Sequence, residues 1–167
     1  MGPKAHKQHA PRSLRVAVLT VSTSRGLAED KSGHWMNRQA RREGHEVVFH
    51  QVVPDDRFEI TKQLVAVIDT QAPDLVLVNG GTGLSPSDVT IEAIAPLFKK
   101  ELTAFAPLFS QLSFEEIDSA AIVSRATAGI IKQTAVFCLP GSLNACKLAC
   151  KALIFPEAGH IAMHLRR

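Results

Sequence analysis

The segment Asp74-Leu-Val-Leu-Val-Asn-Gly-Gly-Thr-Gly-Leu-Ser-Pro-Ser-Asp88 joins an apolar run to a glycine-rich loop. The run from Leu75 to Val78 has the length and the β-branched content of a buried strand. A strand that ends in a loop of glycines and hydroxyl residues brings backbone N–H groups close to a ligand, which suits phosphate or another anion. Because Asp88 adds a carboxylate to the same loop, the segment predicts a site for a small anionic ligand, with a metal ion as a further option.

Strand and helix patterns alternate on both sides of this segment. Predicted strands cover residues 14–21, 46–53, 75–78 and 134–139. Predicted helices run from Ser32, as the capping residue, to about Glu43, through residues 60–68, from Thr90 onward, and over 102–117 and 143–155. This alternation predicts an α/β fold, a three-layer sandwich with a mostly parallel central sheet that helices cover on both faces.

Four loops leave the carboxyl ends of the predicted strands, where ligands bind in sheets of this kind. They cover residues 22–31, 54–57, 80–88 and 140–143, and three of them carry carboxylates. Carboxylates from separate loops beside an anion-binding loop make chemical sense if a hard cation bridges carboxylate and phosphate. The candidate polar residues of these loops are Ser22, Thr23, Ser24, Asp30, Asp55, Asp56, Thr82, Ser85, Asp88 and Ser142.

Local alternatives stay open at several of these positions. The glycine loop is neither a Walker A motif, since no Lys-Ser/Thr follows at the needed spacing, nor a GxGxxG motif, and glycines after a strand also serve tight turns. One of Asp55 and Asp56 is expected to cap the next helix, which leaves the other to face the site. His160 and His164 lie one helical turn apart near Glu157, but their order is not His-Glu-x-x-His, and a metal site there is not favoured.

Composition narrows the classes of protein. The chain has 167 residues, 46% hydrophobic and 21% charged, which fits one globular domain with no membrane-spanning run. Four of its basic residues lie within the first fifteen positions, and the remaining 15 basic and 16 acidic residues leave a net charge of −1, so nucleic acid is not an expected partner. The three cysteines form no CxxC pair, which predicts reduced, packed thiols and a cytoplasmic protein. Residues 1–13 are predicted to be a flexible basic tail and residues 14–167 the domain.

Five motifs, in the expected order, resemble the MoaB/MogA family of molybdenum cofactor biosynthesis. They are Asp30-Lys-Ser-Gly33, Val53-Pro-Asp-Asp56, the segment from Asn79 through Asp88 to Ala93, Ser124-Arg-Ala-Thr-Ala-Gly129 and Leu139-Pro-Gly-Ser142. The resemblance covers about residues 14–155, and Ser113-Phe-Glu-Glu-Ile117 resembles the MoaB branch.

The resemblance implies a molybdopterin-binding fold and the adenylylation of molybdopterin with Mg²⁺ and ATP, with pyrophosphate released. Its two key acidic positions fall on Asp55 and Asp88, as catalytic residues and Mg²⁺ ligands. The residues expected to bind substrate are Ser22, Asn79, Gly80, Gly81, Thr82, Gly83, Ser85, Pro140, Gly141 and Ser142. The alternative is a protein of the same fold that binds pterin, or acts as a scaffold, without turnover.

Two further expectations follow from the resemblance. Ser22-Thr23 stands where the family commonly has Ser-Asp, which bears on the choice between catalysis and binding alone. The family also tends to form trimers or hexamers, so a homo-oligomer is expected, with part of the face that carries Phe105, Leu108, Phe109 and Leu112 against a neighbouring subunit.

Overall fold

The computed structural model describes residue 11 and residues 13–166. The predicted tail, residues 1–13, therefore falls almost wholly outside the described residues. Among the described residues, six strands form one sheet in the order β2-β1-β3-β6-β5-β4. The strands are β1 (Arg15–Val21), β2 (Glu46–Val53), β3 (Leu75–Asn79), β4 (Lys100–Glu101), β5 (Thr127–Ile131) and β6 (Thr134–Leu139).

The sheet is mixed but mostly parallel. The pairs β1–β2, β1–β3 and β3–β6 run parallel, whereas β5 runs antiparallel to both β6 and β4. The helices are α2 (Lys31–Arg42), α3 (Arg57–Gln71), α4 (Thr90–Ile94), α5 (Phe105–Ile117), α6 (Leu143–Ala149) and α7 (Phe155–Leu165). Short turns of other helix types are η1 (Leu27–Glu29), η2 (Ala95–Leu97), η3 (Asp118–Val123) and η4 (Cys150–Ile154).

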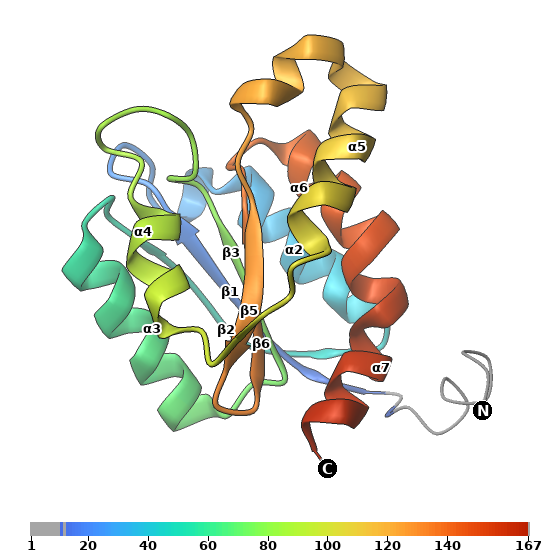
Figure 1. Cartoon of the computed structure of the whole chain (residues 1–167). Helices are drawn as coiled ribbons and strands as arrows, with labels where there is room; N and C mark the ends of the chain where they lie inside the picture. Colours follow the sequence, from blue (N-terminus) through green and yellow to red (C-terminus); the bar gives the residue numbers. More distant parts are fainter. Residues whose placement is uncertain (1–10, 12, 167) are drawn as a thin grey trace.

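Helices cover both faces of the sheet, so the predicted three-layer α/β sandwich is confirmed. In Figure 1, α3 and α4 lie on one side of the sheet and α2, α5, α6 and α7 on the other. Each face has its own apolar core, and neighbouring residues of β1 divide between the two: Val16 and Val18 pack in one cluster, Ala17 and Leu19 in the other. This double burial explains why the central strands are continuous apolar runs without alternation.

Two local predictions need correction. The N-cap of α2 is Asp30, whose side chain accepts a hydrogen bond from the Gly33 N–H, and Ser32 lies inside the helix, where its hydroxyl donates to the Gly141 carbonyl. Strand β5 was not predicted because Gly129 interrupts its apolar run, and glycine weakens a strand pattern. The reason for this glycine is the Phe98 ring, which occupies the space that a Cβ would fill.

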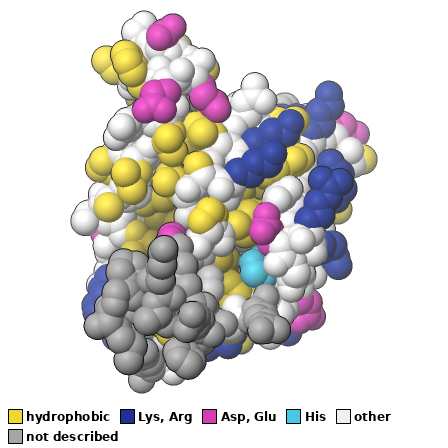
Figure 2. Space-filling model, turned by 90° about the vertical axis from the view of Figure 1, so that its right-hand side faces the viewer, with side chains coloured by type: hydrophobic (Ala, Val, Ile, Leu, Met, Phe, Trp, Pro, Cys, Tyr) yellow, Lys and Arg dark blue, Asp and Glu magenta, His cyan; other side chains and the backbone are white. Residues whose placement is uncertain are grey.

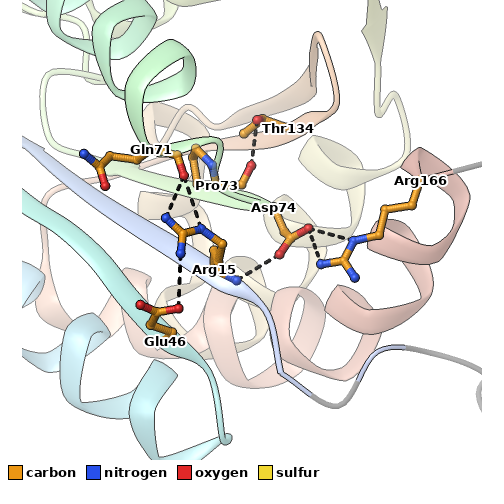
Figure 3. A network of polar contacts seen from close by, with 7 residues as sticks. All are labelled: Arg15, Glu46, Gln71, Pro73, Asp74, Thr134 and Arg166. Carbon is orange, nitrogen blue, oxygen red and sulfur yellow. Dashed lines mark hydrogen bonds and ion pairs between the residues drawn. The ribbon is translucent and has the colours of Figure 1, made fainter.

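At the amino ends of the central strands, a polar network ties the last turn of the chain to the sheet (Figure 3). The Asp74 carboxylate accepts hydrogen bonds from the Arg15 backbone N–H at 2.9 Å and from the Arg166 guanidinium at 2.7 and 3.1 Å. Arg15 in turn donates to the Gln71 carbonyl and to Glu46. A hollow of about 520 Å³ opens beside this network, but its cations Arg15, Arg166 and Lys132 are each paired with a carboxylate. This end of the sheet therefore offers an anion little uncompensated positive charge.

Among the described residues, no helix has the length and apolar character needed to cross a membrane.

Candidate functional site

The order of the strands places a crevice at the carboxyl ends of β1 and β3. The chain runs from β1 to β2 on one side and returns to β3 on the other, and a parallel sheet binds ligands where the strand order reverses in this way. A pocket of about 370 Å³ lies at this point, within the range of small-ligand sites. The pocket is lined by Val21, Ser22, Ser24, Arg25, Asp55, Gly80, Gly81, Thr82, Gly83, Ser87, Asp88, Val123, Ser124, Arg125, Pro140 and Gly141.

The glycine loop forms one wall of this pocket. Gly80 and Gly81 have φ angles of +93° and +65°, in the left-handed region that glycine tolerates. A Cβ on Gly80 would collide with the Val21 carbonyl, so the loop passes directly against the end of β1. The buried Thr90 hydroxyl donates to the Gly80 carbonyl at 2.8 Å, and the Thr90 N–H donates to the Gly81 carbonyl at 2.9 Å. These bonds fix the loop before any ligand binds.

The two acidic residues after β2 have different roles. Asp56 caps α3, since its side chain accepts a hydrogen bond from the Glu59 N–H at 2.9 Å. Asp55 is half-buried and lines the pocket, and its Oδ2 accepts hydrogen bonds from the Thr23 N–H at 2.8 Å and the Thr23 hydroxyl at 2.9 Å. Its Oδ1 faces Gly81, where a Cβ would lie 3.0 Å away.

Asp88 closes the far end of the glycine loop and also lines the pocket. Its Oδ2 accepts a hydrogen bond from the Ser85 N–H at 2.9 Å, and its own N–H donates to the Ser85 carbonyl at 2.8 Å. A Cβ on Gly83 would lie 2.7 Å from the same Oδ2. No hydrogen bond within the described residues engages Oδ1 of either Asp55 or Asp88, so each carboxylate keeps one oxygen for a ligand.

The Arg125 side chain stabilises the glycine loop by hydrogen bonds to its carbonyls. Its Nε–H donates to the carbonyls of Thr82 at 2.8 Å and Gly83 at 3.2 Å, and its terminal nitrogens form a bidentate pair with Glu92 at 2.6 and 3.2 Å. The hydrogen bond from Arg125 lowers the pKa of Glu92, and the same contact raises the pKa of Arg125. Arg125 therefore holds the glycine loop against α4, and Glu92 compensates its charge.

A buried polar network lies beneath the loop. Asn79 donates to the Thr20 hydroxyl at 2.7 Å, and that hydroxyl donates to Asp30 Oδ2 at 2.6 Å. His50 Nε2 lies 2.8 Å from the same oxygen and, because a carboxylate only accepts, carries the proton in this contact. Burial opposes ionisation of Asp30, but the hydrogen bonds from His50, Thr20 and Gly33 outweigh it and hold the pKa of the carboxyl below its usual range.

Comparisons with known proteins identify the family to which this chain belongs. Residues 17–160 match the family described as "Probable molybdopterin binding domain". This chain belongs to that molybdopterin-binding family. Molybdenum cofactor biosynthesis protein B of Bacillus subtilis is 46% identical over 168 residues, which cover 100% of this chain and 99% of the relative. A protein of Pyrococcus furiosus named molybdopterin adenylyltransferase is 42% identical over 172 residues and 99% of both chains.

Solved structures agree. A crystal structure of molybdenum cofactor biosynthesis protein B matches with a TM-score of 0.91 at 41% identity, covering 95% of this chain and 99% of that chain. The structure of the tungsten cofactor synthesizing protein MoaB from Pyrococcus furiosus matches with a TM-score of 0.86 at 40% identity, covering 95% and 100%. The predicted membership of the MoaB branch and the molybdopterin-binding fold are confirmed.

The structure brings most of the predicted site residues of this molybdopterin-binding domain together, and leaves three away from the pocket wall. Ser22, Asp55, the glycine loop, Asp88, Pro140 and Gly141 all line the pocket. Asn79 is 1% exposed and belongs to the buried network. Ser142 caps α6 by accepting a hydrogen bond from the Ala145 N–H, and Ser85 bonds within its own loop.

Ser24, one of the candidate polar loop residues, also lines the pocket, whereas the polar lining residues Arg25, Ser87, Ser124 and Arg125 carried no site prediction. Arg125 stands in the Ser-Arg motif of the molybdopterin-binding resemblance, so its motif was the available signal. Arg25 stands in a polar loop where the sequence offers no periodic pattern to single it out.

The other candidate residues lie elsewhere. His160 and His164 on α7 contact each other through their Nε2 atoms at 3.0 Å, and His160 Nδ1 contacts Glu157 at 3.1 Å. Within the part of the chain that the structure describes, no group of three potential ligands could hold a metal ion. The three cysteines are free and buried, and burial raises the pKa of each thiol, that of Cys146 to about 12.

Proposed function

We propose that this chain binds molybdopterin in the pocket at the ends of β1 and β3 and adenylylates it with ATP and Mg²⁺. The observation that carries the proposal is the placement of two carboxylates, Asp55 and Asp88, around one glycine-lined pocket. Further support comes from the Pyrococcus furiosus relative, which is named for this activity and matches almost the whole chain at 42% identity.

In the proposed reaction, an oxygen of the pterin's terminal phosphate attacks the α-phosphorus of ATP. A new phosphorus–oxygen bond forms, the bond from the α-phosphorus to the bridging oxygen breaks, and pyrophosphate leaves with its electron pair. The protein's part in such a transfer is mainly to align the two reactants and to offset their crowded negative charge. The glycine loop, which Thr90 fixes, binds an anionic group of one reactant. The loops at the carboxyl ends of β1 and β6 position the other reactant.

Asp55 and Asp88 fit a magnesium site in their donor chemistry. Each presents one carboxylate oxygen without a hydrogen bond among the described residues, and Mg²⁺ in phosphate-transfer sites takes one or two carboxylates together with phosphate oxygens and waters. When bound there, Mg²⁺ supplies charge stabilisation for the phosphates. Thr23 orients Asp55, and the Ser85 N–H orients Asp88, so both acids are held toward the pocket in advance.

The second candidate function is pterin binding without turnover. One observation favours it: Thr23 stands where the family commonly has an acid, and both its N–H and its hydroxyl bond to Asp55 Oδ2. The pocket thereby has one carboxylate fewer, and half of the Asp55 carboxylate is occupied within the protein.

One experiment decides between the two functions. The purified chain is incubated with molybdopterin, ATP and MgCl₂, and adenylylated pterin and pyrophosphate are measured. We expect Asp55→Asn and Asp88→Asn to lower turnover by about 100-fold or more, since each removes a carboxylate but keeps the hydrogen-bond acceptor of its loop. Asp56→Asn is the matched control, because asparagine caps a helix as well as aspartate and Asp56 does not line the pocket.

Pterin binding without product by the unsubstituted chain would favour the second function. Equal turnover by the variants at positions 55 and 56 would remove Asp55 from the proposed mechanism.

A further inference from the structure

Two arginines reach the pocket, and their surroundings differ. Arg125 uses its Nε–H on two loop carbonyls and both terminal nitrogens on Glu92, so its fork is committed to the protein. Arg25 is exposed, and its backbone N–H donates to the Ser22 hydroxyl at 3.2 Å. Its guanidinium makes no hydrogen bond or ion pair with any residue in the described part of the chain.

The Arg25 side chain lies close to the part of the pocket wall that Gly141 forms. A Cβ built on Gly141 would lie 3.9 Å from Arg25 Nη2 and 3.2 Å from the Gly80 Cα. The guanidinium therefore lies beside the point where the glycine loop meets the Pro140–Gly141 turn. Gly80, Gly141 and Arg25 all line the pocket, so a ligand group bound at this junction would lie beside both backbones and beside the guanidinium.

The charges of the pocket show what such a group would be. Asp55 and Asp88 bring two negative charges, and Glu92 compensates Arg125, which leaves Arg25 as the uncompensated cation among the described lining residues. An anionic ligand in this pocket needs positive charge to offset the two carboxylates. A guanidinium meets phosphate with two parallel N–H donors, which gives it both energy and orientation.

We propose that Arg25 contacts a phosphate group of the ligand bound in this pocket, and so selects phosphorylated ligands over their uncharged counterparts. The assignment rests on the proposed function in that the phosphate belongs either to the nucleotide or to the pterin. Arg25 is thus a ligand-contact residue, whereas Arg125 positions the loop.

The test is calorimetric titration of the full chain with four probes: ATP and inorganic pyrophosphate, each with MgCl₂, molybdopterin, and adenosine. We expect Arg25→Ala to weaken binding of the contacted phosphate ligand by about 10- to 100-fold, the usual range for a charge-assisted hydrogen bond. Arg25→Lys should recover part of the affinity, because it restores charge without the fork. Arg42→Ala, a change of an exposed arginine at the far end of α2, is the control and should stay within about twofold of the parent.

The pattern of losses identifies the phosphate. Weaker ATP and pyrophosphate binding with unchanged molybdopterin binding assigns Arg25 to the nucleotide, and the reverse assigns it to the pterin. In either case the salt dependence of the affected affinity should be smaller in Arg25→Ala than in the parent.

Other outcomes overturn the assignment. Unchanged affinities in Arg25→Ala for ATP, pyrophosphate and molybdopterin would do so while leaving the proposed function intact. If Arg25→Ala weakened adenosine binding as much as ATP binding, the assignment would also be overturned, because adenosine has no phosphate and the effect would lie in the loop. A parent chain that binds pyrophosphate through Arg25 but neither ATP nor molybdopterin would keep the anion contact and reject the proposed function, and a parent that binds no probe would reject both.

Discussion

Gly81 and Gly83 lie two residues apart in the same loop, yet a methyl group would act differently at each. Gly81 has a φ of +65°, and a Cβ there would collide with the buried Thr90 hydroxyl. Gly83 needs no left-handed backbone, and its Cβ would lie 2.7 Å from Asp88 Oδ2. The first position is therefore constrained mainly by the backbone and by Thr90, with the Asp55 carboxylate also close at 3.0 Å, and the second only by the Asp88 carboxylate.

We predict that Gly81→Ala lowers the free energy of unfolding by about 1–3 kcal/mol, because the left-handed backbone and the clash both add strain. Gly83→Ala should stay within about 1 kcal/mol of the parent but weaken Mg²⁺-dependent ligand binding, because it displaces the Asp88 carboxylate. Thermal unfolding and calorimetric titration of both variants measure the difference. Unchanged binding by a fully folded Gly83→Ala would separate Asp88 from the ligand.

For single residues, the sequence predicted which residue types form the site better than it predicted where each side chain points. The aspartates after Pro54 were expected to divide between cap and pocket, and the structure assigns the cap to Asp56. The resemblance placed Asn79 in the site, but in parallel register it lies opposite Thr20, and its buried side chain donates to the Thr20 hydroxyl. Arg25 was not predicted, since only the approach of three separate loops gives an exposed arginine a place in a pocket.

At the scale of elements, the buried Asp30 joins β1, α2 and β2, and Thr20 links this junction to Asn79 on β3. Its carboxylate caps α2 through the Gly33 N–H and accepts from Thr20 on β1 and His50 on β2. The folded-state pKa of Asp30 is below its usual range, so the carboxylate stabilises the fold above the unfolded-state pKa. That stabilisation is lost as the pH falls through the lower, folded-state pKa.

We predict that Asp30→Asn lowers the free energy of unfolding at pH 7 by about 1–3 kcal/mol, because an amide N–H₂ would face two donors, the Thr20 hydroxyl and the His50 N–H. The difference in unfolding free energy between parent and variant should narrow as the pH falls below about 4, where Asp30 of the unfolded parent begins to protonate. Chemical denaturation at a series of pH values checks this. Asp69→Asn, which changes an exposed ion-paired acid, is the control, and a constant gap from pH 7 to pH 3 would contradict the linkage.

Among the elements, the long apolar and periodic ones were predictable and the short ones were not. Strand β2 begins and ends at the predicted residues, since five of its eight residues are valine or phenylalanine and Gly44 and Pro54 bound the segment. Strand β4 has two residues and β5 contains a glycine, so both depend on sheet partners and not on local preference. The true cap of α2 was missed because Asp30 and Ser32 are both good capping residues, and tertiary contacts decide between them.

For the whole molecule, the surface relevant to assembly is the outer side of α5 and η3. Phe105 and Phe109, two of the four residues expected to face a neighbouring subunit, are 7% and 1% exposed and pack in the chain's own core. At the top of Figure 2, where the turn from α5 to η3 lies in Figure 1, hydrophobic and acidic side chains gather on the surface. The exposed large hydrophobic residues of these two elements are Leu108, Phe114, Ile117, Ile122 and Val123.

We predict a trimer or hexamer at micromolar concentration that dissociates when Phe114→Asp and Ile122→Asp are combined, because their side chains are 57% and 88% exposed and so contribute little to the core. Light scattering gives the mass, and circular dichroism checks that the fold is retained. Phe58→Asp, a change of a 70% exposed phenylalanine on α3, should leave the mass unchanged. A monomer mass for the unsubstituted chain would remove the prediction.

The position of β6 has a consequence for how the protein is made. It lies between β3 and β5 in the sheet although it is the last strand in the chain. As the nascent chain emerges from the ribosome, β1, β2 and β3 are complete while the β3 edge waits for a partner through the synthesis of residues 80–133. Such an edge pairs readily with other chains, and partly synthesised proteins are exposed to aggregation for this reason. Release of residues 134–139 from the ribosome is therefore the step that lets β6 pair with β3 and close this edge.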